Sequence, residues 1–489
     1  MIGLIESLLL VLVTLFVIYF IRSKPDEDSS IPYAKYGSYP IIGHLIAFTR
    51  NRTKVLLECH RRYGACFRIR LANQRFIMIP SHADWMAIVK NSSFKFTGTE
   101  LGIEIFGFSS VFLDHPELDP DTHRLYVQHL KNRDGLHPMV VEFVRRMYEA
   151  MRNEKVSLEK NHSASKWIST GLLEFSHRML FRPSTVALFG DIDTAALEQH
   201  FRLFDNKFHY FFIPFPKWVY SYFLRKELNA RSSLGKSWQN NCDPNNASNF
   251  YRDRLAVYES HSDWLPKEEI GKLVTAFFWA SLGNTIPAVF WSLFYILRDP
   301  KALQHIQQEM DVHLPFISLD EADSSTAYWT PEQIDSCMYL ESAINETIRL
   351  VGAPFMLRKC CRDAQTSLED GRQINIKAGE NLAWYAGVSH FDENLFPRAN
   401  EFIFDRFLNK KAESVPGYMP FGGGKSICPG RFFARYEIKT CVAMLLRYME
   451  YQFKDMKAVP KQKLTRVGFG IAPPDHDVPI VYRYRVCSH

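Results

Sequence analysis

The sequence lacks the cysteine patterns that mark structural zinc sites and disulfide frameworks. It contains nine cysteines, an odd number, with no repeated spacing and no Cys-x-x-Cys pair. Zinc knuckles are built on such pairs, and small secreted domains on even sets of regularly spaced cysteines. Both absences argue against these classes and favour a reducing compartment for the folded part of the chain.

Three further absences narrow the function. There is no block of Lys and Arg and no Gly/Ser-rich tract that would suggest a nucleic-acid arm, so we expect no nucleic-acid partner. No internal repeat occurs at the periods of solenoid proteins. No Gly-x-Gly-x-x-Gly fingerprint occurs, so a nicotinamide cofactor would have to bind to a separate protein. The formal net charge of +6, spread over 489 residues, suits an acidic membrane face or an acidic protein partner.

What the sequence does contain begins with an apolar run at residues 2–21. Its length matches the roughly 20 residues that a helix needs to cross a bilayer. No basic segment precedes the run and no small-x-small cleavage site follows it, which favours an uncleaved anchor over a signal peptide. Arg22 and Lys24 follow directly and favour a cytosolic position for the rest of the chain. We therefore expect a membrane anchor at 1–24 and a single large cytosolic domain at 25–489.

Hydrophobic periodicity predicts a mainly α-helical domain with small β-sheets. Helical spacing of apolar residues covers 136–151, 165–179, 267–297, 300–314 and 331–350. Alternating apolar and polar residues predict a hairpin at 67–80 and further strands at 373–385 and 480–486. Residues 225–263 are polar and poor in pattern, so we expect a surface connection between helices there.

One short stretch places a thiol in an unusual setting. Phe421, Gly424, Cys428 and Gly430 have the spacing Phe-x-x-Gly-x-x-x-Cys-x-Gly, directly before a segment with helical spacing. Free amides and the helix dipole stabilise a thiolate at a helix N-terminus, and glycines allow a flat ligand to approach the backbone. From these residues alone the thiol could be a redox sensor, a nucleophile, a zinc ligand or an iron ligand.

The stretch resembles the haem-binding loop of the cytochrome P-450 superfamily, the haem-thiolate monooxygenases, and further segments in the expected order extend the resemblance over nearly the whole chain. Glu346-Thr-Ile-Arg349 is similar to the Glu-x-x-Arg helix of this family, and 401–407, with Arg406, to its later arginine segment. Residues 280–285 fall where the oxygen-binding helix of the family would lie. The resemblance implies a single large cytochrome P-450 fold domain behind the anchor.

The resemblance also implies cofactors. Cys428 would be the axial thiolate ligand of haem b, the ligand type that favours cleavage of the O–O bond. Electrons would come from NADPH through a separate flavoprotein reductase. The other implied haem contacts are Phe421, Gly424, Gly430, Arg358 and Arg124. Two features depart from the family pattern: the usual Trp-x-x-x-Arg is not visible on an earlier helix, and Ser426 stands where an arginine is usual.

The matching segments imply two further sets of roles. Glu346, Arg349 and Arg406 would form a structural charge-paired triad, since guanidinium groups bind carboxylates bidentately. Thr285, with the adjacent Asn284, would deliver protons during dioxygen activation. Judged by residue type alone, a helical threonine more often returns its hydroxyl to the carbonyl four residues earlier.

Residues 279–291 and the C-terminal stretch resemble the branch that contains cholesterol and oxysterol 7-alpha-hydroxylases, sterol 12-alpha-hydroxylase and prostacyclin synthase. This implies a sterol or oxysterol hydroxylase in the endoplasmic reticulum membrane with its catalytic domain facing the cytosol. The implied substrate pocket is Trp279, Leu282, Phe355, Met356, Phe469 and Ile471. Two alternatives remain: an endoperoxide isomerase similar to prostacyclin synthase, and a non-catalytic haem- and lipid-binding protein. The presence of Thr285 favours a monooxygenase, because an isomerisation needs no proton delivery.

Overall fold

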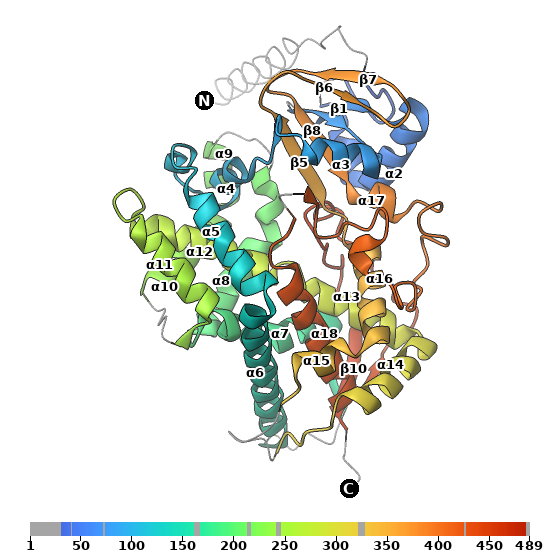
Figure 1. The fold of residues 1–489 in the computed structure, drawn as a ribbon. Coiled ribbons are helices and arrows are strands. Elements are labelled where there is room, and N and C mark those ends of the chain that lie inside the picture. Colours follow the sequence, from blue (N-terminus) through green and yellow to red (C-terminus); the bar gives the residue numbers. More distant parts are fainter. Residues whose placement is uncertain are drawn as a thin grey trace, which may run out of the picture. The chain divides into compact units, whose positions relative to one another are not determined.

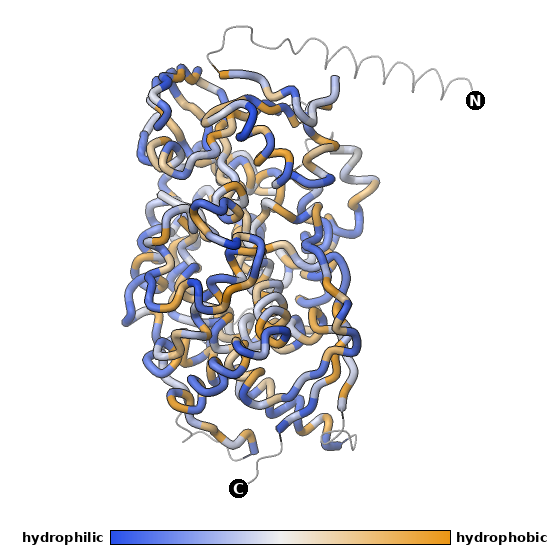
Figure 2. The backbone as a smooth tube through the Cα atoms, turned by 90° about the vertical axis from the view of Figure 1, so that its right-hand side faces the viewer, coloured by the Kyte–Doolittle hydropathy of each residue, from blue (hydrophilic) through white to orange (hydrophobic). Residues whose placement is uncertain are grey.

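The computed structural model describes residues 31–40, 42–71, 74–160, 167–212, 217–240, 246–320, 328–424 and 427–485. The predicted anchor at 1–24 lies outside the described residues, as does Ser426. Helices predominate and the sheets are small, which confirms the predicted mainly α-helical class (Figure 1). Hydrophilic and hydrophobic residues are interspersed along most of the described chain (Figure 2).

The chain divides into two compact units, each made of three stretches. The first, here called the sheet unit, comprises Met1–Thr97, Ala353–Ala399 and Pro416–Ile427. The second, the helical unit, comprises Gly98–Gly352, Asn400–Val415 and Cys428–His489.

The sheet unit is built on a five-stranded sheet in the order β1-β2-β8-β5-β3. The strands are β1 (Phe67–Leu71), β2 (Gln74–Met78), β8 (Asn381–Tyr385), β5 (Phe355–Cys360) and β3 (Phe94–Lys95). β1 and β2 pair in antiparallel fashion, as predicted for 67–80, and β8 runs parallel to β2. A separate ribbon joins β6 (Ala364–Ser367) to β7 (Gln373–Ile376). The helices of this unit are α2 (Leu45–Tyr63), α3 (His82–Lys90) and α17 (Ala386–His390).

The sheet unit has its own apolar core. Buried Trp85 of α3 and Trp384 of β8 lie in one cluster with residues of β2, β5 and β7. The indole of Trp384 donates a hydrogen bond to the carbonyl of Pro80 at 3.1 Å, so its polar atom is satisfied inside the core. This packing holds β5, which carries two of the predicted pocket residues.

The helical unit contains most of the helices. Those before residue 267 are α4 (Gly98–Phe106), α5 (Leu118–Tyr126), α6 (Arg133–Lys160), α7 (Leu172–Phe189), α8 (Thr194–Lys207), α9 (Lys217–Phe223), α10 (Arg225–Asn240) and α11 (Asn249–Ser260). Those after it are α12 (Lys267–Leu282), α13 (Thr285–Arg298), α14 (Pro300–His313), α15 (Pro331–Asp335), α16 (Met338–Val351) and α18 (Arg431–Tyr448). A three-stranded sheet orders β4 (Ile168–Gly171), β10 (Pro479–Tyr484) and β9 (Met449–Phe453).

Local signals fix several of these helix boundaries. Asp299 accepts hydrogen bonds from the amides of Lys301 and Ala302, and Pro300 occupies the first turn of α14. Thr330 and Gln333 form a capping box at the start of α15. The predicted helices at 300–314 and 331–350 therefore form close to their predicted limits, the latter as α15 and α16.

Two predicted segments are wrong. The helix expected over 165–179 begins only at Leu172, because Ile168–Gly171 pairs with β10 as strand β4. The surface connection expected at 225–263 contains α10 and α11 instead. Tertiary packing explains this difference: polar α10 buries Leu234 and Trp238 and packs on α8 and α12.

The stretch Lys267–Arg298 is, among the described residues, the one helix long and apolar enough to cross a membrane by length and composition. Inside the protein, however, 61% of its most apolar window is buried. It therefore packs as a core helix of the helical unit, with α13 beside α7, α16 and α18.

Candidate functional site

Cys428 lies immediately before α18 in the helical unit. The helix begins at Arg431, and Gly430 is its N-cap residue. Burial raises the pKa of the Cys428 thiol, while hydrogen bonds from the backbone amides of Gly430 and Arg431 and the charge of Arg431 lower it. A Cβ placed on Gly430 would meet no atom within 4 Å, so the backbone beside the thiol is not covered by packing. This combination fits a cysteine that ligates through sulfur at the positive end of a helix.

Phe421 and Gly424 lie in the sheet unit, on the loop that leads to this cysteine. Gly424 has φ +66°, in the region that favours glycine. A Cβ at this position would lie 3.0 Å from side-chain atoms of Val89 on α3. Both the backbone conformation and the close approach to α3 therefore require glycine at position 424.

Arg358, on β5 of the sheet unit, is a buried cation. Its side chain stacks near the rings of Trp85 and Phe96, at 5.8 and 5.6 Å, and donates a hydrogen bond to the carbonyl of Leu357. Burial lowers its pKa, and no carboxylate among the described residues pairs with it. A buried guanidinium that pairs with no carboxylate among the described residues is suited to bind a haem propionate. Arg124, by contrast, is exposed on α5 of the helical unit.

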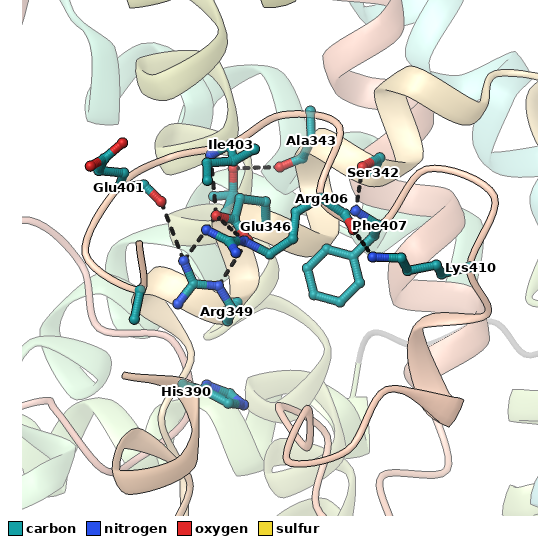
Figure 3. Close-up of polar contacts among 12 residues, drawn as sticks. Ser342, Ala343, Glu346, Arg349, His390, Glu401, Ile403, Arg406, Phe407 and Lys410 are labelled. Atoms are coloured by element: carbon teal, nitrogen blue, oxygen red, sulfur yellow. Dashed lines mark hydrogen bonds and ion pairs between the residues drawn. The ribbon is translucent and has the colours of Figure 1, made fainter. Parts of the chain in front are cut away.

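The structure brings Glu346, Arg349 and Arg406 together (Figure 3). Arg349, one turn after Glu346 on α16, donates to both carboxylate oxygens at 2.8 and 2.9 Å. The Nε of Arg406 lies 2.9 Å from both oxygens. The side chains of Glu346 and Arg349 are fully buried and that of Arg406 is 10% exposed.

Backbone groups complete this cluster and hold the segment 401–407 against α16. The amide of Ile403 donates to Glu346 at 3.1 Å, and Arg349 donates to the carbonyl of Glu401 at 3.3 Å. The amide of Phe407 donates to the hydroxyl of Ser342 at 2.9 Å. The resemblance to the family implies the three charged members, but no sequence pattern predicts which main-chain groups bond to them.

The junction of α12 and α13 carries Asn284 and Thr285. The helix is interrupted at Gly283 and Asn284. Gly283 lies four residues before Pro287, whose ring clashes with the carbonyl at that position and whose nitrogen has no hydrogen to donate to it. The hydroxyl of Thr285 donates to the carbonyl of Ser281 at 2.7 Å. The side-chain oxygen of Asn284 accepts a hydrogen bond from the amide of Ile471 at 2.9 Å.

A cleft of about 270 Å³ in the helical unit reaches this junction. Leu282, Gly283, Ile286 and Pro287 line one side of it. The other side carries charged residues of both signs, among them Arg202, Asp205, Lys463, Arg466 and Asp477.

The predicted pocket residues fall into two sets. Trp279, Leu282, Phe469 and Ile471 belong to the helical unit, whereas Phe355 and Met356 lie on β5 of the sheet unit. Phe355 stacks on Tyr385 at 4.6 Å within its own unit. Met356 is buried in the core of that unit.

In the helical unit, aromatic rings connect Trp279 to Phe469. The ring of Phe208 lies 4.3 Å from that of Trp279 and 5.6 Å from that of Phe469, and Phe212 lies 4.4 Å from Phe469. The sequence analysis missed Phe208 and Phe212, although the run Phe-His-Tyr-Phe-Phe at 208–212 is a visible aromatic signal.

Comparisons with known proteins identify the family of the chain. The Cytochrome P450 family model matches residues 34–480. The 7-alpha-hydroxycholest-4-en-3-one 12-alpha-hydroxylase of Oryctolagus cuniculus is 29% identical and covers 99% of each chain. Cytochrome P450 7B1 of Mus musculus is 28% identical over 99% of this chain and 96% of its own, and Cytochrome P450 7A1 of Rattus norvegicus 25% over 96% of each. The solved structure of retinoic acid bound cyanobacterial CYP120A1 superposes with a TM-score of 0.70, at 16% identity, over 93% of this chain and 99% of that one.

Proposed function

Because the chain belongs to the cytochrome P450 family and is a monooxygenase of that family, we propose that it hydroxylates a sterol or oxysterol in the manner of the 7-alpha-hydroxylases. The observation that carries the substrate class is similarity along nearly the whole chain to proteins named as sterol 12-alpha-hydroxylase and cholesterol 7-alpha-monooxygenase. The similarity is not confined to the segments around the thiol, so it includes the segments that would contact substrate.

Haem b, when bound, supplies the oxygen-activating chemistry, and the Cys428 thiolate would be the protein ligand that holds it. The amides of Gly430 and Arg431 stabilise negative charge on that sulfur. Arg358 would neutralise a propionate, and glycine at 424 keeps the loop close to α3. Glu346, Arg349 and Arg406 have a structural role: they hold the segment 401–407 on α16.

Thr285 is the residue that we assign to proton delivery. Its Oγ1 donates its proton to the carbonyl of Ser281, and its lone pairs accept a hydrogen bond from water. In the proposed role the O–H leaves Ser281 and gives its proton to the oxygen being reduced, while the water bonded to Oγ1 replaces that proton. The neighbouring Asn284 already uses its side-chain oxygen for Ile471.

The apolar walls suit a rigid sterol. Trp279, Phe208 and Phe469 offer aromatic surface in the helical unit, and Leu282, three residues after Trp279 on α12, is fully buried. Burial of apolar surface drives the binding of such a ligand. We further propose the endoplasmic reticulum membrane as location, with a cytosolic catalytic domain and an NADPH-dependent flavoprotein reductase as electron donor.

A sterol panel, incubated with NADPH in the presence and absence of reductase, tests the activity. We expect one or more hydroxylated sterols only when reductase is present. Conversion of a prostaglandin endoperoxide without reductase would replace the proposal by an isomerase. Binding of sterol with no reductase-dependent NADPH consumption would replace it by a carrier.

The ligand assignment is tested separately. Cys428→Ser is expected to abolish the red-shifted carbon-monoxide band of the reduced protein, because serine does not supply a thiolate. The matched control is Cys361→Ser, which alters an exposed free cysteine of the sheet unit and should leave the band unchanged. An unchanged band in Cys428→Ser would exclude this cysteine as the ligand.

A further inference from the structure

The segment Arg466–Ala472, here called the C-terminal segment, is irregular and depends on side chains from elsewhere for its position. It contains no strand or helix apart from an isolated bridge between Ile471 and Gly352. At one end Arg466 donates to the carbonyl and the carboxylate of Asp205 on α8, at 2.5 and 3.1 Å. Without such bonds, a loop of this kind has many accessible conformations.

At the other end the helix that carries Thr285 provides two attachments. Asn284 accepts the amide of Ile471 at 2.9 Å, and the indole of Trp291 donates to the carbonyl of Ala472 at 2.9 Å. Positions 284 and 291 are seven residues apart, which places them two turns apart on the same helical face. Ile471 and Ala472, which are adjacent in the C-terminal segment, are therefore hydrogen-bonded to two side chains on one face at the start of α13.

Gly470 makes the attachment at Asn284 possible. Its φ is +99°, in the region that favours glycine, and a Cβ there would lie 2.1 Å from the side-chain oxygen of Asn284. The backbone turn at Gly470 thus brings the Ile471 amide to Asn284 and leaves no room for another side chain. Because Ile471 donates an N–H, the atom of Asn284 that faces it is the oxygen.

We propose that Asn284 is a positioning residue, which fixes Phe469 and Ile471 through the Ile471 amide and thereby determines which carbon of the substrate is oxidised. The proposal rests on the proposed function for the substrate but assigns Asn284 a role other than proton delivery. Phe469 lies two residues from the bond and contacts Phe208 and Phe212. A change in the position of Ile471 therefore alters the apolar wall.

Hydrogen exchange tests the restraint without catalysis. In the haem-loaded full chain, Asn284→Leu removes the acceptor, and we expect exchange of the Ile471 amide to accelerate roughly tenfold, as for the loss of one buried hydrogen bond. Asn284→Asp keeps a carboxylate oxygen as acceptor and should stay within about threefold of the native rate. Gly470→Ala should reproduce the effect of Asn284→Leu from the opposite side. An intact carbon-monoxide band certifies that each variant is folded and carries haem.

Product analysis tests the consequence. With the sterol that the native protein oxidises best, Asn284→Leu and Gly470→Ala are expected to lower the ratio of major to minor hydroxylated product by about fivefold or more, while Asn284→Asp retains it. Thr285→Ala is the contrasting variant: it should consume NADPH without product and keep the native product ratio.

Two results would overturn the proposal. One is native exchange of the Ile471 amide in Asn284→Leu. The other is a native product ratio in Asn284→Leu combined with uncoupled NADPH consumption, which would assign Asn284 to proton delivery. Failure of the native protein to oxidise any sterol would count against the proposed substrate class instead, and the exchange result would still decide the restraint.

Discussion

Glu346 connects helix α16 to the segment 401–407 through its carboxylate. Its buried carboxylate accepts hydrogen bonds from two guanidinium groups and from the amide of Ile403 (Figure 3). Those donors come from a helix and from a segment more than fifty residues away in the sequence. Loss of the carboxylate would leave buried positive charge without this partner, which costs more than the net contribution of the pair itself.

We therefore expect Glu346→Gln to lower the free energy of unfolding by roughly 3 to 5 kcal/mol. Glu174→Gln is the control, because Glu174 and Arg202 form an ion pair whose side chains are 52% and 36% exposed, so that its loss should cost at most about 1 kcal/mol. Urea denaturation of both variants measures the difference. Equal losses in the two variants would show that Glu346 is no more than an ordinary surface partner.

Glu437 is a buried acid on α18 that the sequence analysis did not single out. Ser184 of α7 donates to its carboxyl at 2.5 Å. Burial raises the pKa of Glu437 to about 8, although the hydrogen bond from Ser184 lowers it. The folded state therefore binds a proton that the unfolded state releases near its ordinary pKa. The stability contributed by the protonated form is complete at low pH and is lost as pH rises towards 8.

Glu437→Gln removes this titration. Between pH 6 and pH 8 we expect the native protein to lose roughly 2 kcal/mol more unfolding free energy than the variant. Below the ordinary pKa of glutamate, the unfolding free energies of the two proteins should change with pH in nearly the same way. Urea midpoints at several pH values measure it. Parallel pH profiles for the two proteins would mean that the carboxyl is already ionised, or solvated, in the folded state.

At the level of elements, α7 begins where a remote residue caps it. The carboxylate of Asp477 accepts the amides of Leu173 and Glu174 at 2.7 and 3.1 Å, and also that of Val478. The first turn of the helix is thus attached to the segment that leads into β10. A Cβ on Gly171 would lie 2.0 Å from the same carboxylate, so only glycine at this position leaves room for Asp477 to cap α7.

Asp477→Ala is expected to cost about 1 to 2 kcal/mol, because it removes an N-cap, and to accelerate hydrogen exchange both in the first turn of α7 and at Val478. Asp193→Ala is the matched control, since Asp193 caps α8 only locally through Ala195 and Ala196. Its effect should be confined to α8. If Asp477→Ala accelerated exchange in α7 but not at Val478, the proposed link between α7 and the segment before β10 would be wrong.

The elements also show where sequence reasoning succeeds and where it fails. The helix predicted over 267–297 forms as α12 and α13, and Pro287 explains the interruption between them, because the proline ring clashes with the carbonyl four residues earlier, at Gly283. The helix over 165–179 was wrong at its start because strand pairing with residues 479–482 and the cap by Asp477 involve residues about 300 positions away. Periodicity reports local preference, so it does not detect partners at that separation.

For the whole molecule, the motifs identify the family, whereas the division into two units has no marker in the sequence. Each unit is assembled from three separate stretches, and the boundaries at Thr97 and Gly352 carry no Gly/Ser-rich linker. Three consecutive glycines do precede the boundary at Ile427, but they belong to the stretch that resembles the haem-binding loop and do not mark a domain linker by themselves. The candidate site residues are those that the resemblance to the family implies, carried over from its matching segments. The contacts that hold them, such as Ile471 with Asn284, arise from chain folding and could not be predicted from the sequence.

The N-terminal run makes a prediction for the whole molecule that is independent of the site. Deletion of residues 1–24 should leave the carbon-monoxide band intact, because Cys428 and its amide donors belong to the helical unit. The same deletion should release the protein from membranes in an alkaline-wash fractionation. Leu12→Arg places a charge at the centre of the run and should weaken insertion by roughly 2.5 to 3.5 kcal/mol, whereas Leu12→Ala is the matched control. If the deletion variant stayed in the membrane pellet, another surface would have to bind the bilayer, and the assignment of 1–24 as the anchor would be wrong.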